Sequence, residues 1–323
     1  MSSKVVQLSD GNGMPLTGYG LWDVDRAVCA DQVYAAIKEG YRCFDGACDY
    51  GNEVEAGLGI ARAIQDGIVQ RSELFIVSKL WCTFHDPKHA KAIAHRQLSD
   101  WGLEYFDLYL IHFPVALKYV DPSKSYPPGW TGSSDSNVKE ITFAHVPMYQ
   151  TWAAMEGLVG ERLTRSIGIS NFDIQLISDL LSYSKIAPAV LQIEHYPYLT
   201  QQRLVKYAQA RGITITAYCS FGPQSAVAAK LANVGDLDSL LDHQLIKKIS
   251  SEHKKTPSQV LLRWATQRGI AVIPKSRGLE HMRQNLDMQW NLEESEIGAI
   301  GALDQRLRLN DPVLHGFDVP IFS

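Results

Sequence analysis

Short apolar runs alternate with amphipathic stretches along most of the 323-residue chain. Seven of these runs are rich in Ile, Val, Leu, Tyr and Phe, stay apolar for four or five residues and end in a polar residue. Strands with this pattern are buried on both faces, as in parallel sheets. Together with a shorter run near residue 20, they predict eight strands: "GYGLW", "YRCFDGA", "LFIVSKL", "YFDLYLIHF", "TRSIGIS", "AVLQIEH", "TITAYCS" and "IAVIPKS".

The stretches between the predicted strands have the sequence signals of helices. Asn52 is a candidate N-cap for a helix with two glutamates in its first turn. The apolar stripe of this helix, expected to face the core, is Val54, Leu58, Ala61 and Ile64. Thr256 and Pro257 begin a second helix that Gly269 ends. Its expected apolar face is Val260, Leu261 and Trp264.

Eight strands in βαβα order within one chain of this length favour a (β/α)8 barrel of the TIM type over an open doubly wound sheet. The opening "KVVQLSDGNGMPLTG" predicts a hairpin, because "DGNG" supplies turn residues, and we expect it to cap the bottom of the barrel. Residues 118–146, rich in Pro, Gly and Ser, predict a long loop over the catalytic face. No stretch resembles a linker, so we expect one domain over residues 1–323.

Composition narrows the classes of partner. The formal net charge is -4 and no run is rich in Lys or Arg, so neither nucleic acid nor a membrane surface is expected as a partner. The first residues do not resemble a signal peptide and no segment of ~18 apolar residues occurs, which favours a cytosolic protein. The 5 cysteines, without a CxxC pair, predict free thiols rather than disulfides or a metal site. A small polar substrate is therefore expected.

Polar side chains stand at the ends of three consecutive predicted strands. Asp45, Lys79 and His112 end the second, third and fourth strands, and Tyr50 lies in the loop after the second. In a barrel these ends meet at one face, where a buried lysine needs an anionic partner such as Asp45. We expect the lysine to lower the pKa of Tyr50, so that the phenol can protonate a developing alkoxide while His112 orients the carbonyl. Each residue alone could be structural, but the set predicts carbonyl reduction.

The ends of the later strands carry groups suited to a hydride donor. Ser170, Asn171 and Gln192 offer amide and hydroxyl partners for a nicotinamide carboxamide. Tyr218 can stack on the nicotinamide ring, and the loop from 221 to 225 can wrap a pyrophosphate. Each of these residues, taken singly, is compatible with a place in a turn or in the core. Their order along successive strand ends favours a bound nicotinamide dinucleotide.

The segment after the last predicted strand bears on the choice of cofactor. Lys275, Ser276 and Arg277 stand at a helix entrance, where barrels commonly hold phosphate. Two cations and a hydroxyl suit the 2'-phosphate of NADPH, which NADH lacks. The sequence therefore predicts that NADPH is preferred and that NADH is a weak cofactor or none.

The chain resembles the aldo-keto reductases in "FDGACDYGNE", "LFIVSKLW", "YLIHFP", "SIGISNF" and "IPKS", and the resemblance covers nearly the whole chain. Within that superfamily it is most similar to the fungal aldose reductases that reduce D-xylose or L-arabinose. The resemblance implies reduction of an open-chain pentose in pentose catabolism, with Tyr50 as acid, Lys79 and Asp45 as its tuning pair, and His112 as the orienting group. A homodimer is also implied, since similar sugar reductases are often dimeric.

The same resemblance implies two sets of binding residues. The cofactor set is Ser170, Asn171, Gln192, Tyr218, Ser220, Phe221, Gln224, Ser225, Lys275, Ser276, Arg277, His281, Gln284 and Asn285. The substrate set is Trp22, Asp49, Trp81, His112, Phe113 and Asn310.

Three positions depart from the family pattern. Arg277 replaces the usual Asn and His281 the usual Arg, which removes the arginine that stacks on adenine in the family; Arg277 or His281 could substitute for it. Leu309 replaces a Phe, which bears on the width of the pocket and on the choice between D-xylose and L-arabinose. In addition, the "AVAAK" segment lacks the carboxylate found in relatives that accept NADH.

Four other functions fit parts of the pattern. A non-catalytic module could bind NADPH and regulate a partner, although all four acid-base residues are present. A barrel hydrolase or isomerase would need a metal or a carboxylate pair, and the strand ends offer no convincing ligand set. A reductase of uronic acids would favour a basic group in the pocket, and Lys79 is the sole candidate; a glycerol-type aldehyde is the remaining alternative.

Overall fold

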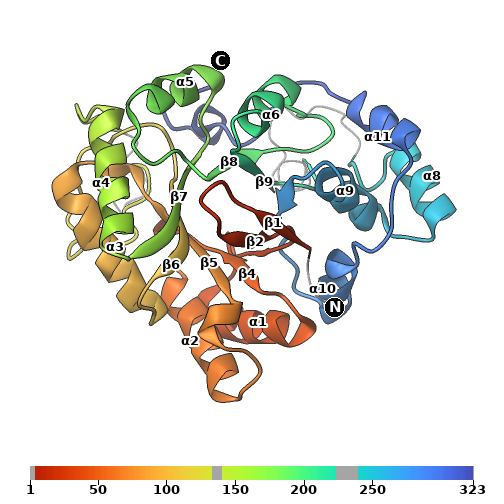
Figure 1. The fold of residues 1–323 in the computed structure, drawn as a ribbon, viewed down its shortest axis with the longest axis horizontal. Helices are drawn as coiled ribbons and strands as arrows, with labels where there is room; N and C mark the ends of the chain where they lie inside the picture. The colour runs from red at the N-terminus through yellow and green to blue at the C-terminus, as the bar shows by residue number, and fades with distance from the viewer. Residues whose placement is uncertain (1–3, 133–139, 223–238, 323) are drawn as a thin grey trace.

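The computed structural model describes residues 4–132, 140–222 and 239–322. Eight parallel strands curl into a barrel, and the helices lie around its outside (Figure 1). The order of the strands in the sheet follows their order in the sequence, so each strand pairs with the strands that precede and follow it along the chain. The strands are β3 (Tyr19–Gly20), β4 (Cys43–Asp45), β5 (Phe75–Leu80), β6 (Phe106–Ile111), β7 (Thr164–Ser170), β8 (Val190–Glu194), β9 (Thr214–Tyr218) and β10 (Ala271–Val272).

The first and last strands of the sheet meet and close the barrel. Gly18 N donates to Val272 O at 2.8 Å, and Gly20 N donates to Pro274 O at 3.4 Å. A Cβ atom at Gly20 would lie 2.6 Å from Ile273 O, so this approach of the two chain segments requires glycine. The closed sheet confirms the (β/α)8 barrel and all eight predicted strands.

The predicted hairpin covers the N-terminal end of the barrel. Strands β1 (Val5–Gln7) and β2 (Gly13–Pro15) pair in antiparallel register and cross the barrel opening in Figure 1. Leu8 and Met14 of this hairpin are buried against Phe75, the first residue of β5. The hairpin therefore acts as an apolar plug, as predicted, and leaves the opposite end of the barrel for chemistry.

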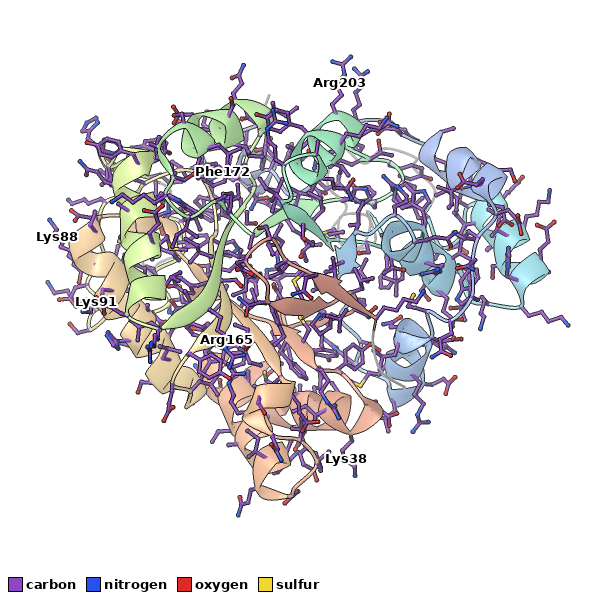
Figure 2. All side chains as sticks on the ribbon, in the orientation of Figure 1. Lys38, Lys88, Lys91, Arg165, Phe172 and Arg203 are labelled. Atoms are coloured by element: carbon purple, nitrogen blue, oxygen red, sulfur yellow. The ribbon has the colours of Figure 1, made fainter. Side chains whose placement is uncertain are left out.

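Helices follow the strands on the outside of the barrel. None of them, within the described ranges, is long and apolar enough to cross a bilayer. Lys38, Lys88, Lys91 and Arg203 project outward from this shell (Figure 2). The helices are α1 (Arg26–Glu39), α2 (Glu53–Gln65), α3 (Pro87–Trp101), α4 (Met148–Gly160), α5 (Ile174–Tyr183), α6 (Gln202–Gln209), α8 (Gln244–His253), α9 (Pro257–Thr266), α10 (Leu279–Leu286) and α11 (Glu294–Gly301).

Helix α9 forms as its sequence predicts. Thr256 accepts a hydrogen bond from Gln259 N at 3.3 Å, and the Gln259 side chain accepts one from Thr256 N at 2.9 Å. This reciprocal capping box satisfies two main-chain donors at the start of the helix. Val260, Leu261 and Trp264 are all buried, which confirms the predicted apolar face.

The predicted face of α2 is wrong. Val54 is 45% exposed and Leu58 is 60% exposed. The helix buries Gly57 and Gly59 instead, because a Cβ atom at either position would overlap the main chain of a neighbouring helix. Asn52 is the first flanking residue, but its side chain donates to main-chain oxygens in the loop after β3 rather than capping α2. The inside face of α2 is therefore a different apolar stripe from the predicted one, centred on the buried Ile60 and on two glycines that allow close backbone packing.

The predicted long loop between β6 and α4 covers part of the C-terminal end of the barrel. The Trp130 ring packs 4.9 Å from the Trp81 ring and 5.0 Å from the Phe113 ring. Trp81 Nε1 also donates to Gly129 O at 2.9 Å. These contacts attach the loop to residues that directly follow β5 and β6.

The cysteines and potential metal ligands lie apart from one another. All five cysteines are unpaired thiols, as predicted, and four of them are buried while Cys219 is exposed. In the described ranges no group of three or more His, Cys, Asp and Glu side chains is placed to hold a metal ion.

Candidate active site

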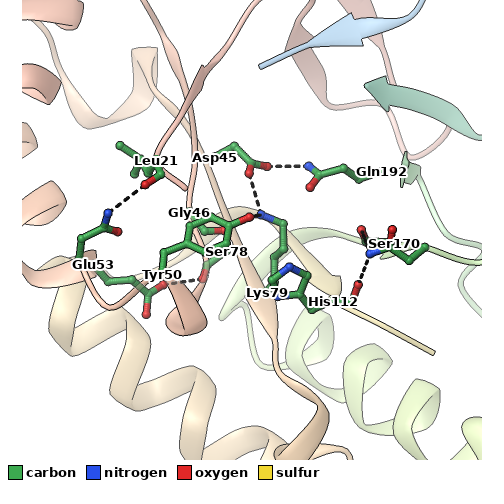
Figure 3. A network of polar contacts seen from close by, with 12 residues as sticks. Leu21, Asp45, Gly46, Tyr50, Glu53, Ser78, Lys79, His112, Ser170 and Gln192 are labelled. Carbon is green, nitrogen blue, oxygen red and sulfur yellow. Dashed lines mark hydrogen bonds and ion pairs between the residues drawn. The ribbon is translucent and has the colours of Figure 1, made fainter. Parts of the chain in front are cut away.

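Asp45, Tyr50, Lys79 and His112 meet at the C-terminal ends of β4, β5 and β6 (Figure 3). Lys79 Nζ donates to Asp45 Oδ1 at 2.6 Å, to Gly46 O at 2.8 Å and to the Tyr50 hydroxyl at 3.0 Å. These three bonds use all three donors of an ammonium group. The ammonium is thereby fixed in direction and faces the phenol oxygen.

The Asp45–Lys79 ion pair is removed from solvent. The Lys79 side chain is 0% exposed and that of Asp45 is 2% exposed. The second Asp45 oxygen accepts a hydrogen bond from Gln192 Nε2 at 2.7 Å. A buried pair of this kind is tolerated only when its remaining polar atoms are also satisfied, and here β8 supplies the missing partner.

Tyr50 ends a short 3-10 turn, Cys48–Tyr50, that Gly51 terminates with φ at 69°. Burial raises the pKa of Tyr50 well above its usual value, and the carboxylates of Asp45 and Asp49 raise it further. The expectation that Lys79 would lower the pKa of Tyr50 is therefore wrong. The physical reason is that Asp45 offsets the positive charge of Lys79, so burial prevails and Tyr50 remains a protonated phenol.

His112 lies beside the phenol and is neutral. Its ring centroid is 5.8 Å from that of Tyr50 and 5.1 Å from that of Trp81. Burial, together with the charge of Lys79, holds the pKa of His112 well below its usual value. Its Nδ1 atom is buried without a hydrogen-bond partner among the described residues. A neutral imidazole at this position can hydrogen-bond a carbonyl oxygen without adding charge.

A second buried carboxylate lies behind Lys79. Glu53, at the start of α2, accepts hydrogen bonds from Ser78 at 2.6 Å, Trp101 at 2.7 Å and Gln97 at 3.1 Å. Gln97 Nε2 also reaches the main-chain oxygen of Lys79 at 3.3 Å. Burial raises the pKa of Glu53 to about 7, although its three donors oppose the shift. Glu53 thus joins α2 and α3 to the strand that carries Lys79.

The raised pKa of Glu53 predicts a pH-dependent stability. The pKa of Glu53 is higher in the folded than in the unfolded chain. The contribution of this carboxyl to the free energy of unfolding is therefore complete below about pH 4.5 and is lost as the pH rises through 7. Relative to a Glu53→Gln variant, the wild-type free energy of unfolding should fall by roughly 2–3 kcal/mol between pH 5 and pH 8. Urea denaturation at both pH values measures this. A Glu104→Gln variant, which changes an exposed carboxylate, is the control. If the difference in the free energy of unfolding between the wild type and Glu53→Gln did not change with pH, the raised pKa of Glu53 would be contradicted.

Three of the predicted nicotinamide residues, Ser170, Asn171 and Tyr218, form one connected network. Asn171, with φ at 64°, donates to His112 O at 2.9 Å and to Ser170 Oγ at 3.1 Å. Its carbonyl oxygen accepts from the Tyr218 hydroxyl at 2.6 Å. Asn310 Nδ2 in turn donates to that hydroxyl at 2.9 Å. Residues from β7, β9 and the C-terminal segment are thus joined to the strand end that bears His112.

Other predicted cofactor residues lie around this network or on α10. Ser220 Oγ is buried and has no hydrogen-bond partner in the described part of the chain, so it is open to a ligand. Phe221 is half-buried beside it. Gln224, Ser225 and the "AVAAK" segment lie outside the described residues.

The predicted 2'-phosphate residues lie between β10 and α10. Lys275 Nζ donates to the main-chain and carboxylate oxygens of Asp23, both at 3.0 Å, so this cation already has an anionic partner. Ser276 is buried, whereas Arg277 and His281 are exposed near the start of α10.

Two further predicted cofactor residues have partners in or beside α10. Gln284 Nε2 donates to Glu280 at 3.0 Å. Asn285 is buried and hydrogen-bonds Tyr41, which lowers the pKa of that phenol against the larger effect of burial.

The predicted substrate residues form an aromatic wall and a polar side. Trp81 and Phe113 are buried with ring centroids 5.9 Å apart. Trp22 is 58% exposed, and Lys275 Nζ lies 5.6 Å from the centroid of its ring. Burial raises the pKa of Asp49 to about 7, while a hydrogen bond from the Gly129 main chain opposes the shift. The sequence analysis missed Trp130, although it is the one tryptophan in the predicted loop.

The arrangement can protonate a carbonyl oxygen but contains no side chain that can deliver hydride. A reduced dinucleotide fits the residues present, since Ser220 Oγ has no partner among the described residues, the Tyr218 ring is half-buried and two exposed side chains, Arg277 and His281, stand at α10. The site is thus equipped for carbonyl reduction with a bound hydride donor.

Comparison with known proteins gives consistent matches. Residues 11–305 match the family model described as the aldo/keto reductase family. The chain is 60% identical over 323 residues to the NAD(P)H-dependent D-xylose reductase of Aspergillus niger, with 100% of both chains covered. It is 57% identical over 323 residues to the probable NAD(P)H-dependent D-xylose reductase of Aspergillus terreus, again over 100% of both. The probable enzyme of the same name from Aspergillus fumigatus is 59% identical over 314 residues, covering 97% of this chain and 98% of that one.

Proposed function

The chain belongs to the aldo/keto reductase family, and on this basis we propose that it reduces the open-chain aldehyde of D-xylose to xylitol with NADPH as the preferred cofactor. The observation that carries the proposal is the fixed contact of 3.0 Å between the buried Lys79 ammonium and the Tyr50 hydroxyl. L-Arabinose, an aldose of the same length, is the second pentose that the site should accept. A role in pentose catabolism follows from these substrates.

Four side chains would carry out the proton transfer. When bound, the reduced nicotinamide supplies the hydride that adds to the carbonyl carbon. Tyr50 gives its hydroxyl proton to the carbonyl oxygen, which becomes the alcohol. The Lys79 ammonium stabilises the phenolate left behind, and Asp45 holds that ammonium in place. Neutral His112 hydrogen-bonds the carbonyl oxygen and fixes its direction.

The high pKa of Tyr50 in the free protein is compatible with this role. A phenol that remains protonated is available as an acid throughout the neutral range. Its proton becomes transferable only when negative charge develops on the substrate oxygen, since an alkoxide is a far stronger base than a carbonyl. The buried ammonium then gains a second anionic partner, which lowers the energy of the product state.

The cofactor would lie along the ends of β7 to β10. Ser170, Asn171 and Gln192 suit the carboxamide, the Tyr218 ring suits the nicotinamide face, and the unpartnered Ser220 hydroxyl suits a phosphate. Near α10, the cationic side chains of Lys275 and Arg277, with Ser276, suit the 2'-phosphate of NADPH. His281 would contact the adenosine, with Gln284 and Asn285 beside it.

Replacing Arg277 with alanine tests the proposed cofactor preference. The exposed guanidinium would form a charge-assisted hydrogen bond with the 2'-phosphate, so its loss should raise the KM for NADPH about 10-fold. The KM for NADH should stay within about two-fold, because NADH has no such phosphate. Arg283→Ala is the matched control, because Arg283 is on α10 but is paired with Glu39 at 2.7 Å. Equal catalytic efficiency of the wild-type protein with both cofactors would contradict the preference.

The proposed pocket combines aromatic and polar side chains. Trp81, Phe113 and Trp130 would pack on the carbon chain of the sugar, while Asp49 and Asn310 would bind its hydroxyls. The Leu309 side chain belongs to the apolar core and is 7% exposed. The effect of Leu309 on the width of the pocket stays a prediction. The same holds for two properties of the whole protein, its assembly as a homodimer and its location in the cytosol.

Product analysis tests the proposed reaction. With D-xylose and NADPH, the protein should form xylitol and NADP+ in equal amounts, as measured by chromatography of the sugars and absorbance of the cofactor. A chelator should not affect the rate, since no side chain in the proposed mechanism holds a metal. Formation of a pentose isomer or of any product without NADPH consumption would contradict the proposal.

A further inference from the structure

Strand β8 ends in Glu194, a carboxylate that the proposed mechanism does not use. It is 0% exposed. Its two oxygens accept hydrogen bonds from Leu309 N at 3.0 and 3.2 Å, and one of them accepts from Asn310 N at 3.0 Å. Arg308 lies farther away, with 3.9 Å between its Nη1 and the carboxylate. The Tyr196 phenol also hydrogen-bonds the carboxylate. Glu194 thus binds two main-chain N–H groups of the C-terminal segment, across 115 residues of sequence, and one neighbouring side chain.

The segment that Glu194 holds has no helix or strand of its own at these positions. Residues 303–311 follow α11 and contain no regular element. Further along the chain of contacts, Tyr196 donates to Leu307 O at 2.7 Å, and Leu307 N donates to Tyr198 O at 3.0 Å. Beyond Leu307, the backbone hydrogen bonds to Glu194 set where the Asn310 amide is placed.

The Asn310 amide begins a chain of hydrogen bonds that runs in one direction. Asn310 Nδ2 donates to the Tyr218 hydroxyl, which donates to Asn171 Oδ1, and Asn171 Nδ2 donates to His112 O. Each of the two middle groups both donates and accepts, so the bonds polarise one another. Because this chain takes up one amide hydrogen of Asn310, the rest of the amide is available to a ligand at the mouth.

We propose that Glu194 is a positioning residue that sets Asn310 for recognition of the sugar hydroxyls remote from the aldehyde. This inference rests on the proposed function. A carboxylate is suited to the task, because it presents acceptors to two successive N–H groups, whereas an amide would turn one N–H donor toward another. Among the described residues, Glu194 makes no hydrogen bond to any of the four proton-transfer side chains. The chain that begins at Asn310 reaches the main-chain oxygen of His112 and not its ring, so we expect the chemical step itself to be insensitive to Glu194.

Glu194→Gln tests the inference when two aldehydes are compared. For D-xylose, kcat/KM should fall about 10-fold, mainly through KM, as expected when hydrogen bonding to a substrate hydroxyl is weakened. For propionaldehyde, which has no hydroxyl groups, kcat/KM should change less than about two-fold. Asn310→Ala should show the same selectivity, and the double variant should lose no more than Asn310→Ala alone.

Two further variants complete the test. Glu156→Gln is the matched control, because Glu156 also accepts from two main-chain N–H groups, those of Lys185 at 2.6 Å and Ile186 at 2.8 Å, before the other end of β8. It should leave the ratio of the two aldehydes unchanged. If Glu194→Gln does not fold, Glu194→Asp serves as the second variant because it keeps the charge. It should show the same selective loss, since its shorter side chain moves the carboxylate away from the main-chain N–H groups.

The outcomes separate this inference from the proposed function. Equal losses for D-xylose and propionaldehyde, or additive losses in the double variant, would overturn the positioning role and leave the reductase proposal intact. A wild-type protein that reduces propionaldehyde but not D-xylose would overturn the sugar-reductase proposal, and the inference with it.

Discussion

Tyr50→Phe is expected to lower kcat for D-xylose by about 10²–10⁴-fold, the range that general acid catalysis contributes. The substitution removes the one hydroxyl that Lys79 holds at 3.0 Å and leaves the aromatic ring in place. Binding of NADPH should stay within about two-fold of the wild type, because the proposed cofactor residues lie at the ends of β7 to β10 and near α10. Stopped-flow or steady-state oxidation of NADPH measures kcat, and quenching of tryptophan fluorescence measures cofactor binding.

Tyr34→Phe is the matched control for this experiment. Tyr34 is on α1 and donates its hydroxyl to Asp66 at 2.7 Å, on the outside of the barrel. Its loss should affect neither kcat nor NADPH binding. If Tyr50→Phe lost cofactor binding together with turnover, Tyr50 would be a structural residue and the proposed acid would have to be sought elsewhere.

Lys79→Met is expected to abolish turnover to a similar extent and also to destabilise the fold. Removing the ammonium leaves the Asp45 carboxylate buried with Gln192 as its remaining side-chain partner. The loss of one partner of a buried ion pair costs about 3–5 kcal/mol in the free energy of unfolding. Urea denaturation at pH 7 measures this cost, and NADPH oxidation measures the loss of activity.

A double variant separates the two effects of Lys79. Lys79→Met combined with Asp45→Asn removes both charges, so it should recover much of the lost stability. It should recover none of the activity, because the phenolate that forms at Tyr50 would still lack its ammonium partner. A Lys79→Met protein as stable as the wild type would contradict a charge-paired Asp45, and an active double variant would contradict the role of Lys79.

The barrel could be predicted because its strands are buried on both faces and its polar residues stand at their ends. The runs around Phe44, Val77 and Leu110 have no polar face, which is the pattern of parallel strands covered by helices. The pattern also located Asp45 and Lys79, because a charged residue at the end of such an apolar run has to lie at the C-terminal end of the barrel. Glu194 ends its strand in the same manner, and this rule applied to every strand would have selected it.

Other features depend on contacts that no local pattern contains. The inside face of α2 includes Gly57 and Gly59 beside the buried Ile60, and the two glycines are there because neighbouring main chain leaves no room for a side chain. The pKa of Tyr50 is raised chiefly by burial and further by the carboxylates of Asp45 and Asp49, and the burial of the phenol is a property of the folded site that the local sequence does not contain. Likewise, the hydrogen bond between Asn310 and Tyr218 joins residues that are 92 positions apart.

The most direct test of the account is the initial rate of NADPH oxidation by the wild-type protein and by Tyr50→Phe with D-xylose, L-arabinose, D-galacturonate and glyceraldehyde. We expect rapid oxidation with the pentoses by the wild-type protein and almost none by the variant, with NADPH bound equally by both. A wild-type protein that binds NADPH but oxidises it with none of the four aldehydes would contradict the reductase proposal and favour a cofactor-binding module that regulates a partner.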